Sequence, residues 1–407
     1  MWKIFMRRDM NTITIVYPTD PLGVVPGGTD TCIRDILRCA PSDINMRLIG
    51  VTSDPVARPV GKWIDCEVGN KPFKFYPLMS VANLERQMRI PLSAQFTWHL
   101  LFNLGVLKDS DVLQFNRIEP ALATLNTTVP KLLIIHQNMN VLKNKSSDIR
   151  WKYLPGLYFW MESFIIRRLK EVFIVREDAV REYKDRFPDK NNNIHFLPTW
   201  MNPDLFYHET GEQKIQSREK LFSKTKVPVD ENIMIFVGRF DHQKDPILLI
   251  DSIAKVFENQ KAGHLILIGD GVLRANVEAR IKHHGIGNRI HLLGAISQDE
   301  VASYLRASDL LLLSSAYEGM PRCVVEALGC GIPVVTTNAG EVTLLVTNNV
   351  NGYIVEERTV EKFSSAVSKA LSKIEDFNGQ PCLDAVDSYS ADVVLKKLYD
   401  TYRHYAN

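Results

Sequence analysis

The sequence has no apolar run that approaches the roughly 20 residues needed to span a membrane. Residues 1–10 carry four charged side chains, and the apolar stretch after them is as short as a strand, so no signal peptide is expected. The six cysteines are dispersed and form no C-x-x-C pair. In a chain of 407 residues this favours reduced, packed thiols over a disulfide framework. We therefore expect a cytoplasmic protein.

Internal repeats of solenoid length are also absent, as are zinc-finger spacings and Arg-rich helices, so no nucleic-acid partner is expected. The net charge is only +2, but it is unevenly spread. Residues 1–207 carry 27 Lys and Arg against 21 Asp and Glu, which gives +6, and the remaining 200 carry 22 against 26, which gives −4. A modestly basic first half suits an anionic partner.

Short apolar runs recur along the chain, and each is followed by a segment of helix length. Apolar strands that alternate with helices are typical of a parallel sheet covered on both faces. Because 407 residues exceed what one hydrophobic core usually supports, the two series of runs predict two doubly wound, Rossmann-like α/β domains. The expected strands are 13–17, 46–51, 112–115, 132–136, 172–175 and 194–197, then 233–237, 264–268, 290–293, 310–314 and 333–336.

The polar segment 202–230 separates the two series and is expected to be the linker. The expected domains are therefore 1–205 and 206–390. A C-terminal helix is expected within 391–407, because its apolar positions form one stripe.

The most specific stretch runs from Ser314 to Gly331, where a strand is followed by a loop and then a helix. Pro321 favours the start of that helix and Gly331 its end. Glu318 in the loop and Glu326 in the helix therefore flank a helix N-terminus, whose free amides favour an anion such as a diphosphate. Glu326 can accept hydrogen bonds from a vicinal diol such as a ribose. The alternative is one capping glutamate and one surface glutamate.

A second motif, from Gly238 to Lys244, follows directly on the expected strand 233–237. Arg239 offers a bidentate fork and Lys244 a point charge, which together suit a diphosphate. The alternative is a solvated basic pair in a loop. Ligands of such sheets bind at the carboxyl ends of the strands, and this position favours a functional role.

Three weaker signals also lie at expected strand ends. Gly27 and Gly28 would let the backbone approach a phosphate or a sugar, although no G-x-G-x-x-G nicotinamide fingerprint is present. His136 ends a buried run and would point into a cleft. Small-residue loops at 269–271 and 294–296 suit a nucleoside. A plain turn remains the alternative for the glycine pair and for the two small-residue loops. A structural role remains the alternative for His136.

Asp109-Ser110-Asp111 imitates a D-x-D metal clamp. It precedes the expected strand 112–115, at the end opposite the ligand edge. We interpret it as turn and cap chemistry, and no metal ion is expected.

In combination and in order, these segments resemble the group-one retaining glycosyltransferases, the family-four enzymes of the GT-B type. The resemblance covers most of the chain and is strongest over 236–355, through VGRFDHQKD, LILIGDGV, EGMPRCVVE, ALGCGIPVVTTNAGEVTLLV and NGYIV. It implies two Rossmann-like domains facing across a cleft, an acceptor-side first domain, a nucleotide-sugar-binding second domain and a last helix that crosses back onto the first.

The resemblance also implies a role for each matched residue. Arg239 and Lys244 would hold the donor diphosphate and stabilise it as it leaves. Glu318 would contact the donor sugar, and His136 would touch that sugar from the other domain. The implied donor and nucleotide-binding residues are Gly27, Gly28, Gly269, Gly271, Ile296, Gly319, Met320 and Glu326.

The implied reaction is transfer of a hexosyl group from a UDP- or GDP-linked sugar, with retention and without metal or other cofactor. A glycan or lipid-linked acceptor in polysaccharide or glycolipid synthesis is expected. Two departures from the family pattern lie near the cleft: Val175-Arg176 replaces a V-x-S segment, and Pro198–Asn202 replaces P-N-G-V-D. An epimerase or phosphorylase on the same scaffold, and a catalytically inactive binding protein, remain alternatives.

The stretch 151–170 is aromatic and basic. Two interpretations stay open. One is a buried crossover helix with a charged rim. The other is an interfacial helix that contacts the inner membrane leaflet through its cations and apolar face. The residues concerned are Trp151, Lys152, Tyr153, Leu154, Leu157, Tyr158, Phe159, Trp160, Phe164, Ile165, Arg167, Arg168 and Lys170.

Overall fold

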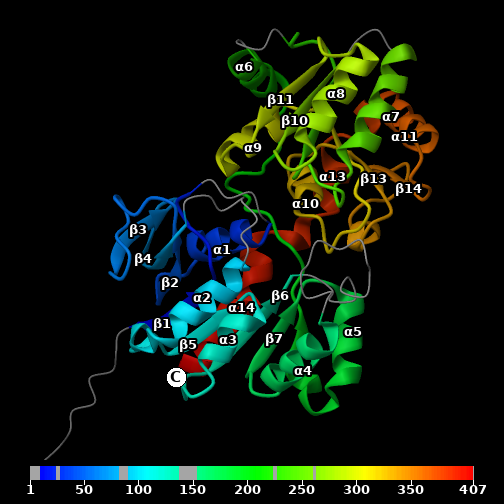
Figure 1. The fold of residues 1–407 in the computed structure, drawn as a ribbon. Coiled ribbons are helices and arrows are strands. Elements are labelled where there is room, and N and C mark those ends of the chain that lie inside the picture. Colours follow the sequence, from blue (N-terminus) through cyan, green and yellow to red (C-terminus); the bar gives the residue numbers. More distant parts are fainter. Residues whose placement is uncertain are drawn as a thin grey trace, which may run out of the picture. The chain divides into compact units, whose positions relative to one another are not determined.

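A computed structural model of the chain describes residues 10–23, 28–81, 90–136, 154–222, 227–259 and 263–406. The chain divides into two compact units. The first comprises Met1–Pro198 together with Leu395–Asn407, and the second comprises Thr199–Val394 (Figure 1). The division thus lies at 198/199 and 394/395, whereas the sequence places it at 205/206 and 390/391.

The first unit is built on an eight-stranded sheet of order β3-β4-β2-β1-β5-β6-β7-β8. All neighbouring strands are parallel except the antiparallel pair β3 and β4. The strands in sequence order are β1 (Asn11–Val16), β2 (Ile44–Thr52), β3 (Ile64–Val68), β4 (Lys71–Ser80), β5 (Val112–Phe115), β6 (Lys131–Ile135), β7 (Glu171–Ile174) and β8 (Ile194–Phe196). Strands β3 and β4 do not appear among the expected strands, because their residues alternate in burial instead of forming a continuous apolar run.

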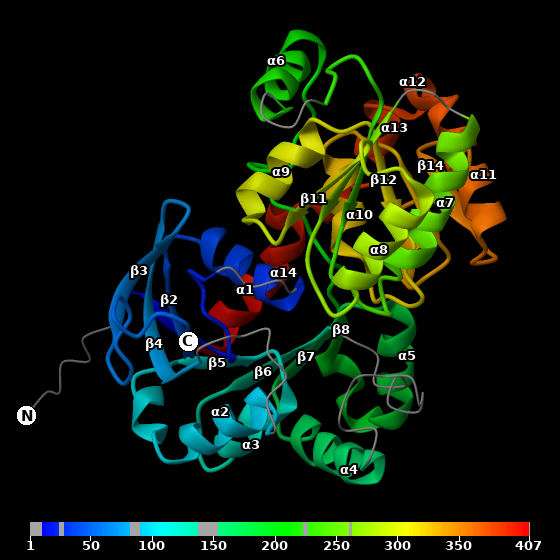
Figure 2. The same cartoon turned by 45° about the horizontal axis from the view of Figure 1, so that its top comes forward.

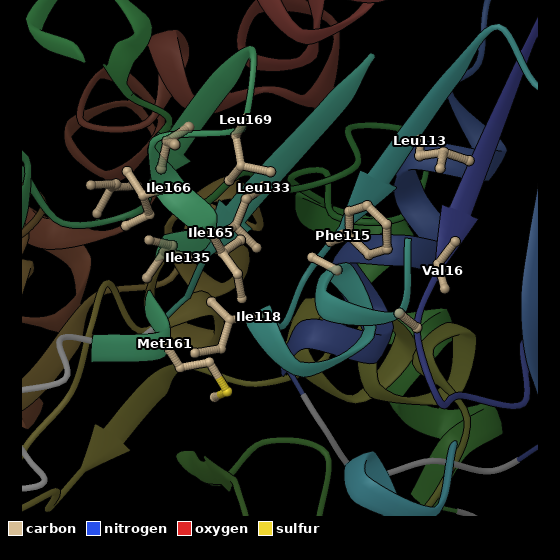
Figure 3. Close-up of a cluster of buried hydrophobic side chains, with 14 of the residues drawn as sticks. Val16, Leu113, Phe115, Ile118, Leu133, Ile135, Met161, Ile165, Ile166 and Leu169 are labelled. Atoms are coloured by element: carbon tan, nitrogen blue, oxygen red, sulfur yellow. The ribbon is translucent and has the colours of Figure 1, made fainter. Parts of the chain in front are cut away.

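Helices cover both faces of this sheet (Figure 2). Leu113 and Phe115 of β5 point into a core that contains apolar residues of α2 (Leu92–Leu101), α3 (Ile118–Ala123), α4 (Pro155–Ile166) and α5 (Glu177–Arg186). Figure 3 shows Met161, Ile165 and Ile166 of α4 in this core. Successive strand residues face opposite sides, so Gln114 points to the other face. The remaining elements of this unit are α1 (Gly28–Arg38), η1 (Leu104–Leu107) and η4 (Pro188–Asn193).

The last helix, α14 (Ala391–Ala406), joins the first unit from Leu395 onward. Its Tyr402 hydroxyl donates to Gln114 Oε1, and its Tyr399 hydroxyl donates to the carbonyl of Ile36 in α1 over 2.8 Å. The expected helix that crosses back onto the first domain is confirmed.

The second unit holds a six-stranded parallel sheet of order β11-β10-β9-β12-β13-β14. The expected fold class, with two doubly wound Rossmann-like domains, is therefore confirmed. The strands are β9 (Ile233–Val237), β10 (His264–Ile268), β11 (Ile290–Gly294), β12 (Leu310–Leu313), β13 (Val334–Thr337) and β14 (Gly352–Val355). The helices are α7 (Pro246–Asn259), α8 (Arg274–His284), α9 (Gln298–Arg306), α10 (Arg322–Gly329), η5 (Glu341–Leu344), α11 (Val360–Leu371), α12 (Ile374–Phe377), α13 (Gln380–Asp384) and η6 (Asp387–Tyr389).

The segment expected to be only a linker contains a further helix, α6 (Gly211–Phe222). Only two of its residues, Arg218 and Phe222, are buried, so its apolar pattern is too weak to predict a helix. Ion pairs hold it instead. Arg218 and Lys214 both reach the Asp309 carboxylate, the latter over 3.0 Å.

Candidate donor site and a polar sheet edge

Two loops that are about 70 residues apart in sequence meet in the second unit because β9 and β12 are neighbours in the sheet. Each loop leaves the carboxyl end of its strand. The Ala316 amide donates to the Gln243 carbonyl over 2.7 Å, and the Ser314 hydroxyl lies 2.9 Å from the carbonyls of Lys244 and Asp245. The basic motif and the two-glutamate motif are thus fixed against each other by the sheet.

Lys244 and Glu318 form an ion pair at the junction of these loops. Lys244 Nζ lies 2.7 Å from Glu318 Oε1, and the Ser315 hydroxyl donates to the same oxygen over 2.6 Å. The two side chains are only 16% and 8% exposed. Burial lowers the pKa of Lys244, but the adjacent carboxylate outweighs burial and raises it overall. Lys244 is therefore charged at neutral pH.

Gly238 lets the aliphatic part of Lys244 lie on the backbone, because a Cβ there would sit 3.2 Å from Lys244 Cδ. Arg239 is the exposed member of the motif, with 53% of its side chain accessible and its guanidinium 3.2 Å from Asp241. Asp241 Oδ1 in turn accepts the Lys244 amide over 2.9 Å. Arg239 is accessible to an incoming anion, whereas Lys244 is held in place.

Glu326 lies in α10, which begins at Arg322 directly after Pro321. Its buried carboxylate accepts a hydrogen bond from Arg322 Nε over 2.6 Å. Arg322 is not among the residues expected from the sequence, although its i, i+4 spacing to Glu326 was the available signal. The helix ends at Gly329, and Gly331 follows with a φ of +73°, the left-handed position expected after a helix end.

The glycine loops have a structural requirement of their own. A Cβ on Gly269 would lie 1.9 Å from the Gly238 carbonyl oxygen, and one on Gly271 would lie 2.6 Å from that of Phe240. These glycines allow two strand-end loops to pack backbone to backbone. Of the other expected donor residues, Ile296 is half-buried before α9, and the buried Met320 accepts the Thr199 hydroxyl through its carbonyl over 3.1 Å. Gly319 sits in the loop between the two glutamates, and its carbonyl accepts the Glu341 amide over 2.9 Å.

His136 of the first unit follows β6 and is positioned by a chain of amides. Asn116 Nδ2 lies 2.8 Å from His136 Nε2, and Gln114 Nε2 donates to Asn116 Oδ1 over 2.9 Å. Tyr402 donates to Gln114 at the far end of this chain. With Nε2 accepting from an amide, the neutral ring carries its proton on Nδ1. Of the expected glycine pair, Gly28 begins α1, and Gly27 lies outside the described residues.

Other polar side chains at the same edge were missed by the sequence analysis. Tyr17 follows β1, Asp30 lies in the first turn of α1, and Arg117 follows β5. Arg117 lies 3.5 Å from Glu119, which also accepts the Ser93 hydroxyl over 3.1 Å. Burial raises the pKa of Asp30, and burial together with Asp30 raises that of Tyr17. The signals that could have found them were the position of Tyr17 and Arg117 just after parallel strands and that of Asp30 in the first turn of the helix that follows β1.

The D-x-D imitation lies at the opposite end of the sheet. Asp111 Oδ2 accepts the Thr12 amide over 2.8 Å, and the Ser110 and Thr14 hydroxyls are 2.7 Å apart. Asp109 adopts a left-handed φ of 71°. The segment therefore links β5 to β1 through hydrogen bonds. This agrees with the turn and cap role that the sequence predicts. Across the described ranges no group of three or more His, Cys, Asp and Glu is arranged to hold a metal.

Two doubly wound units with these loops at their strand ends define a GT-B fold. The structure is similar to sucrose-phosphate synthase from Thermosynechococcus elongatus, with a TM-score of 0.77 and 18% identity over 97% of this chain and 98% of that one. It is also similar to Anabaena HepE in complex with UDP, with a TM-score of 0.70 and 17% identity over 97% of this chain and 100% of that one.

Residues 217–376 match the family of glycosyl transferases group 1. An uncharacterized glycosyltransferase of Methanocaldococcus jannaschii is 25% identical over 237 residues, which are 57% of this chain and 60% of the relative. The UDP-Gal:alpha-D-GlcNAc-diphosphoundecaprenol alpha-1,3-galactosyltransferase of Escherichia coli is 23% identical over 257 residues, 62% of this chain and 64% of the relative. The matched part thus spans less than two thirds of either relative.

Proposed function

We propose that the protein transfers a hexosyl group from a UDP- or GDP-linked sugar to an acceptor with retention of configuration and without a metal ion. The observation that carries this proposal is the buried Lys244–Glu318 pair beside the accessible Arg239, at the carboxyl edge of a parallel sheet. UDP is bound in the HepE complex of the same fold, which supports a nucleotide-sugar donor here.

Each residue has a defined task in the proposed reaction. The bond between the anomeric carbon and the diphosphate oxygen breaks, and the electron pair leaves with the diphosphate. Arg239 and Lys244 stabilise that charge, and preorganised cations of this kind are the largest contribution to many such reactions. Glu318 contacts the sugar, Glu326 accepts from the ribose hydroxyls, and His136 of the first unit touches the sugar. The acceptor oxygen then bonds to the same carbon, and its proton passes to the departing diphosphate oxygen.

A cysteine nucleophile is not part of the proposal. Cys323, the cysteine beside Lys244 and Glu318, is buried, and burial raises the pKa of its thiol to about 12. The thiol therefore stays protonated at neutral pH and is a poor nucleophile.

The acceptor is proposed to be a glycan or a lipid-linked sugar of a cell-surface polysaccharide or glycolipid, and the enzyme to work at the cytoplasmic side of the membrane. The E. coli relative carries diphosphoundecaprenol in the name of its substrate. The first 207 residues carry a net charge of +6, which favours an anionic acceptor or surface. None of the described helices is long and apolar enough to cross a membrane.

The proposal is tested by screening nucleotide sugars for release of UDP or GDP with and without candidate acceptors. R239A and K244A should each lower turnover about a hundredfold or more, as loss of a preorganised donor does. E326A should mainly weaken nucleotide binding, because its contact is similar in ground and transition states. K373A, an exposed change elsewhere in the second unit, is the matched control.

Three outcomes would reject the proposal in whole or in part. Equal, small effects from all three site variants would show that the active site lies elsewhere. Activity that EDTA abolishes and Mg²⁺ restores would reject metal independence. Interconversion of the donor sugar without transfer would identify an epimerase.

A further inference from the structure

One helix of the first unit presents an apolar stripe outward as well as an apolar face inward. Tyr158 of α4 is buried in the core of the sheet, as are Met161, Ile165 and Ile166 (Figure 3). A second set, with helical spacing, points away from this core. Within α4 it comprises Leu157, Trp160 and Phe164, which at 100° per residue span about 60° of the helix surface; Leu154 directly precedes the helix and Arg168 follows it.

The outward stripe is exposed except at Phe164, which is half-buried. Trp160 is 65% exposed, and its ring stacks on Phe164 with centroids 5.7 Å apart. The Arg168 guanidinium lies 3.5 Å from the Phe164 ring centroid and donates to the Phe164 carbonyl over 2.8 Å. Arg168 thus places an apolar stem along the aromatic row and its charge at the end of the row. This is the arrangement of a cation at the boundary between apolar and polar surroundings.

A neighbouring helix of the same layer adds to this surface. Helix α3 packs against both α2 and α4, and all three cover the same face of the sheet (Figures 1 and 2). Trp98 and Phe102, at the end of α2, are 63% and 71% exposed, with ring centroids 5.1 Å apart. Aromatic side chains this exposed are costly in water and mark a surface that contacts another phase or molecule.

The charges beside the stripe are mainly cationic, and the exposed Asp189 lies 3.9 Å from Arg167. Arg167, Arg168 and Lys170 follow α4 and are exposed. The acidic residue within 154–170, Glu162, is buried on the other side, where it accepts from Tyr183 and from Arg186 Nη2 over 2.7 Å. The stripe is therefore apolar and cationic, which complements an anionic lipid surface, where aromatic rings enter the headgroup region and cations meet phosphates.

The surface also starts close to the polar edge of the sheet. Glu119 at the start of α3 accepts from Ser93 at the start of α2, and its charge acts on Tyr158 in the first turn of α4. The helices thus begin together at the edge that carries His136 and Arg117. A lipid-linked acceptor held in a bilayer under the stripe would present its head group near this edge.

We infer that the outer faces of α4 and α2 form a docking surface for an anionic membrane, with α4 lying in the plane of the headgroups. The inference deepens the proposed function by assigning the membrane contact to particular residues. Trp151, Lys152 and Tyr153, which belong to the same aromatic and basic stretch of the sequence, lie outside the described residues and are not needed for it.

Flotation of the full chain with vesicles tests the inference without any enzymatic reaction. Phosphatidylcholine vesicles that contain about one third to one half phosphatidylglycerol should bind the protein at low salt, and vesicles of pure phosphatidylcholine should not. Binding should fade as salt rises to a few hundred millimolar. The triple variant R167E/R168E/K170E should bind on the order of a hundredfold more weakly, at about fivefold per cation.

Two further variants test the apolar contribution to vesicle binding and whether the effect of the cations is specific to this surface. W160S/L157S changes exposed side chains only, so it should keep the wild-type melting temperature and nucleotide binding while losing vesicle binding. K362E/K369E/K373E reverses three exposed lysines of the second unit and should bind vesicles like the wild type. Failure of wild-type binding to anionic vesicles at low salt would overturn the inference. Self-association abolished by W160S/L157S, without vesicle binding, would instead assign the surface to a second copy of the chain. Neither result depends on sugar transfer, so the proposed function stands or falls separately.

Discussion

Changing Glu318 to Gln should separate nucleotide binding from transfer, because Glu318 pairs with the Lys244 ammonium, which the diphosphate also needs as a partner. The structure pairs Glu318 with Lys244 at 2.7 Å in a nearly buried position. The glutamine keeps the shape but removes the negative charge. It leaves the Lys244 ammonium buried and uncompensated, which costs about 3 kcal/mol or more. For a unit of nearly 200 residues this lowers the melting temperature by about 6–12 °C.

Binding of UDP should restore part of that loss, since the diphosphate supplies a new partner for Lys244. If about half of it is recovered, the E318Q variant binds UDP about tenfold more tightly than the wild type. Turnover with the nucleotide sugar should fall nevertheless, because the proposed contact of Glu318 with the sugar is gone. Titration calorimetry with UDP, and melting curves with and without it, measure both effects. E375Q, an exposed neutralisation in α12, is the control.

The opposite pattern would refute this reasoning. If E318Q melts like the wild type and binds UDP equally or more weakly, the Lys244–Glu318 pair does not compete with the nucleotide. Lys244 would then not be a diphosphate ligand.

Two further predictions concern the ion pairs and amides that hold the two units. Burial alone would raise the pKa of Asp309, but Lys214 and Arg218 outweigh it and lower that pKa. The resulting stabilisation is present above the unfolded pKa of about 3.9 and is lost as pH falls through the lower folded value. The free energy of unfolding of D309N should therefore be about 3 kcal/mol lower than that of the wild type at pH 7. The difference between their denaturant midpoints should disappear in acid. A difference that does not change with pH would contradict the stabilising role of the Asp309 carboxylate. N116D replaces the amide donor of His136 with a carboxylate, which favours the protonated ring, and should move the acidic limb of the kcat/KM profile upward by about one pH unit or more. An unshifted limb with unchanged stability would show that Asn116 does not position His136.

The sequence predicts most strands of the second unit because β9, β10, β12 and β13 are largely buried, whereas the partly exposed β14 is not among the expected strands. Runs such as 264–268 are continuously apolar, and the motifs follow them directly. The hairpin of β3 and β4 was not predicted, because it is partly exposed and its burial alternates from residue to residue. Helix α6 was not predicted either, because long-range ion pairs to Asp309 hold it in place.

The candidate site was predictable only where its residues follow a strand in sequence. Arg239, Lys244 and Glu318 meet that condition, so position and chemistry together point to them. That Lys244 and Glu318 pair directly depends on the order of β9 and β12 in the sheet, which no local pattern shows. The amide chain behind His136 ends at Tyr402, almost 270 residues further on. Contacts over such separations cannot be predicted from the spacing of residues in one sequence.

The placement of α14 has a consequence for the order of events during synthesis. Its residues from Leu395 onward complete a face of a unit whose other strands and helices end by Pro198. About 200 residues of the second unit must be translated in between, which takes on the order of 10–40 s at roughly 5–20 residues per second. During that interval the surface around Ile36 and Gln114 lacks the tyrosines that cover it. The first unit to leave the ribosome is thus the last to be finished, and its exposed face is where a chaperone would be needed.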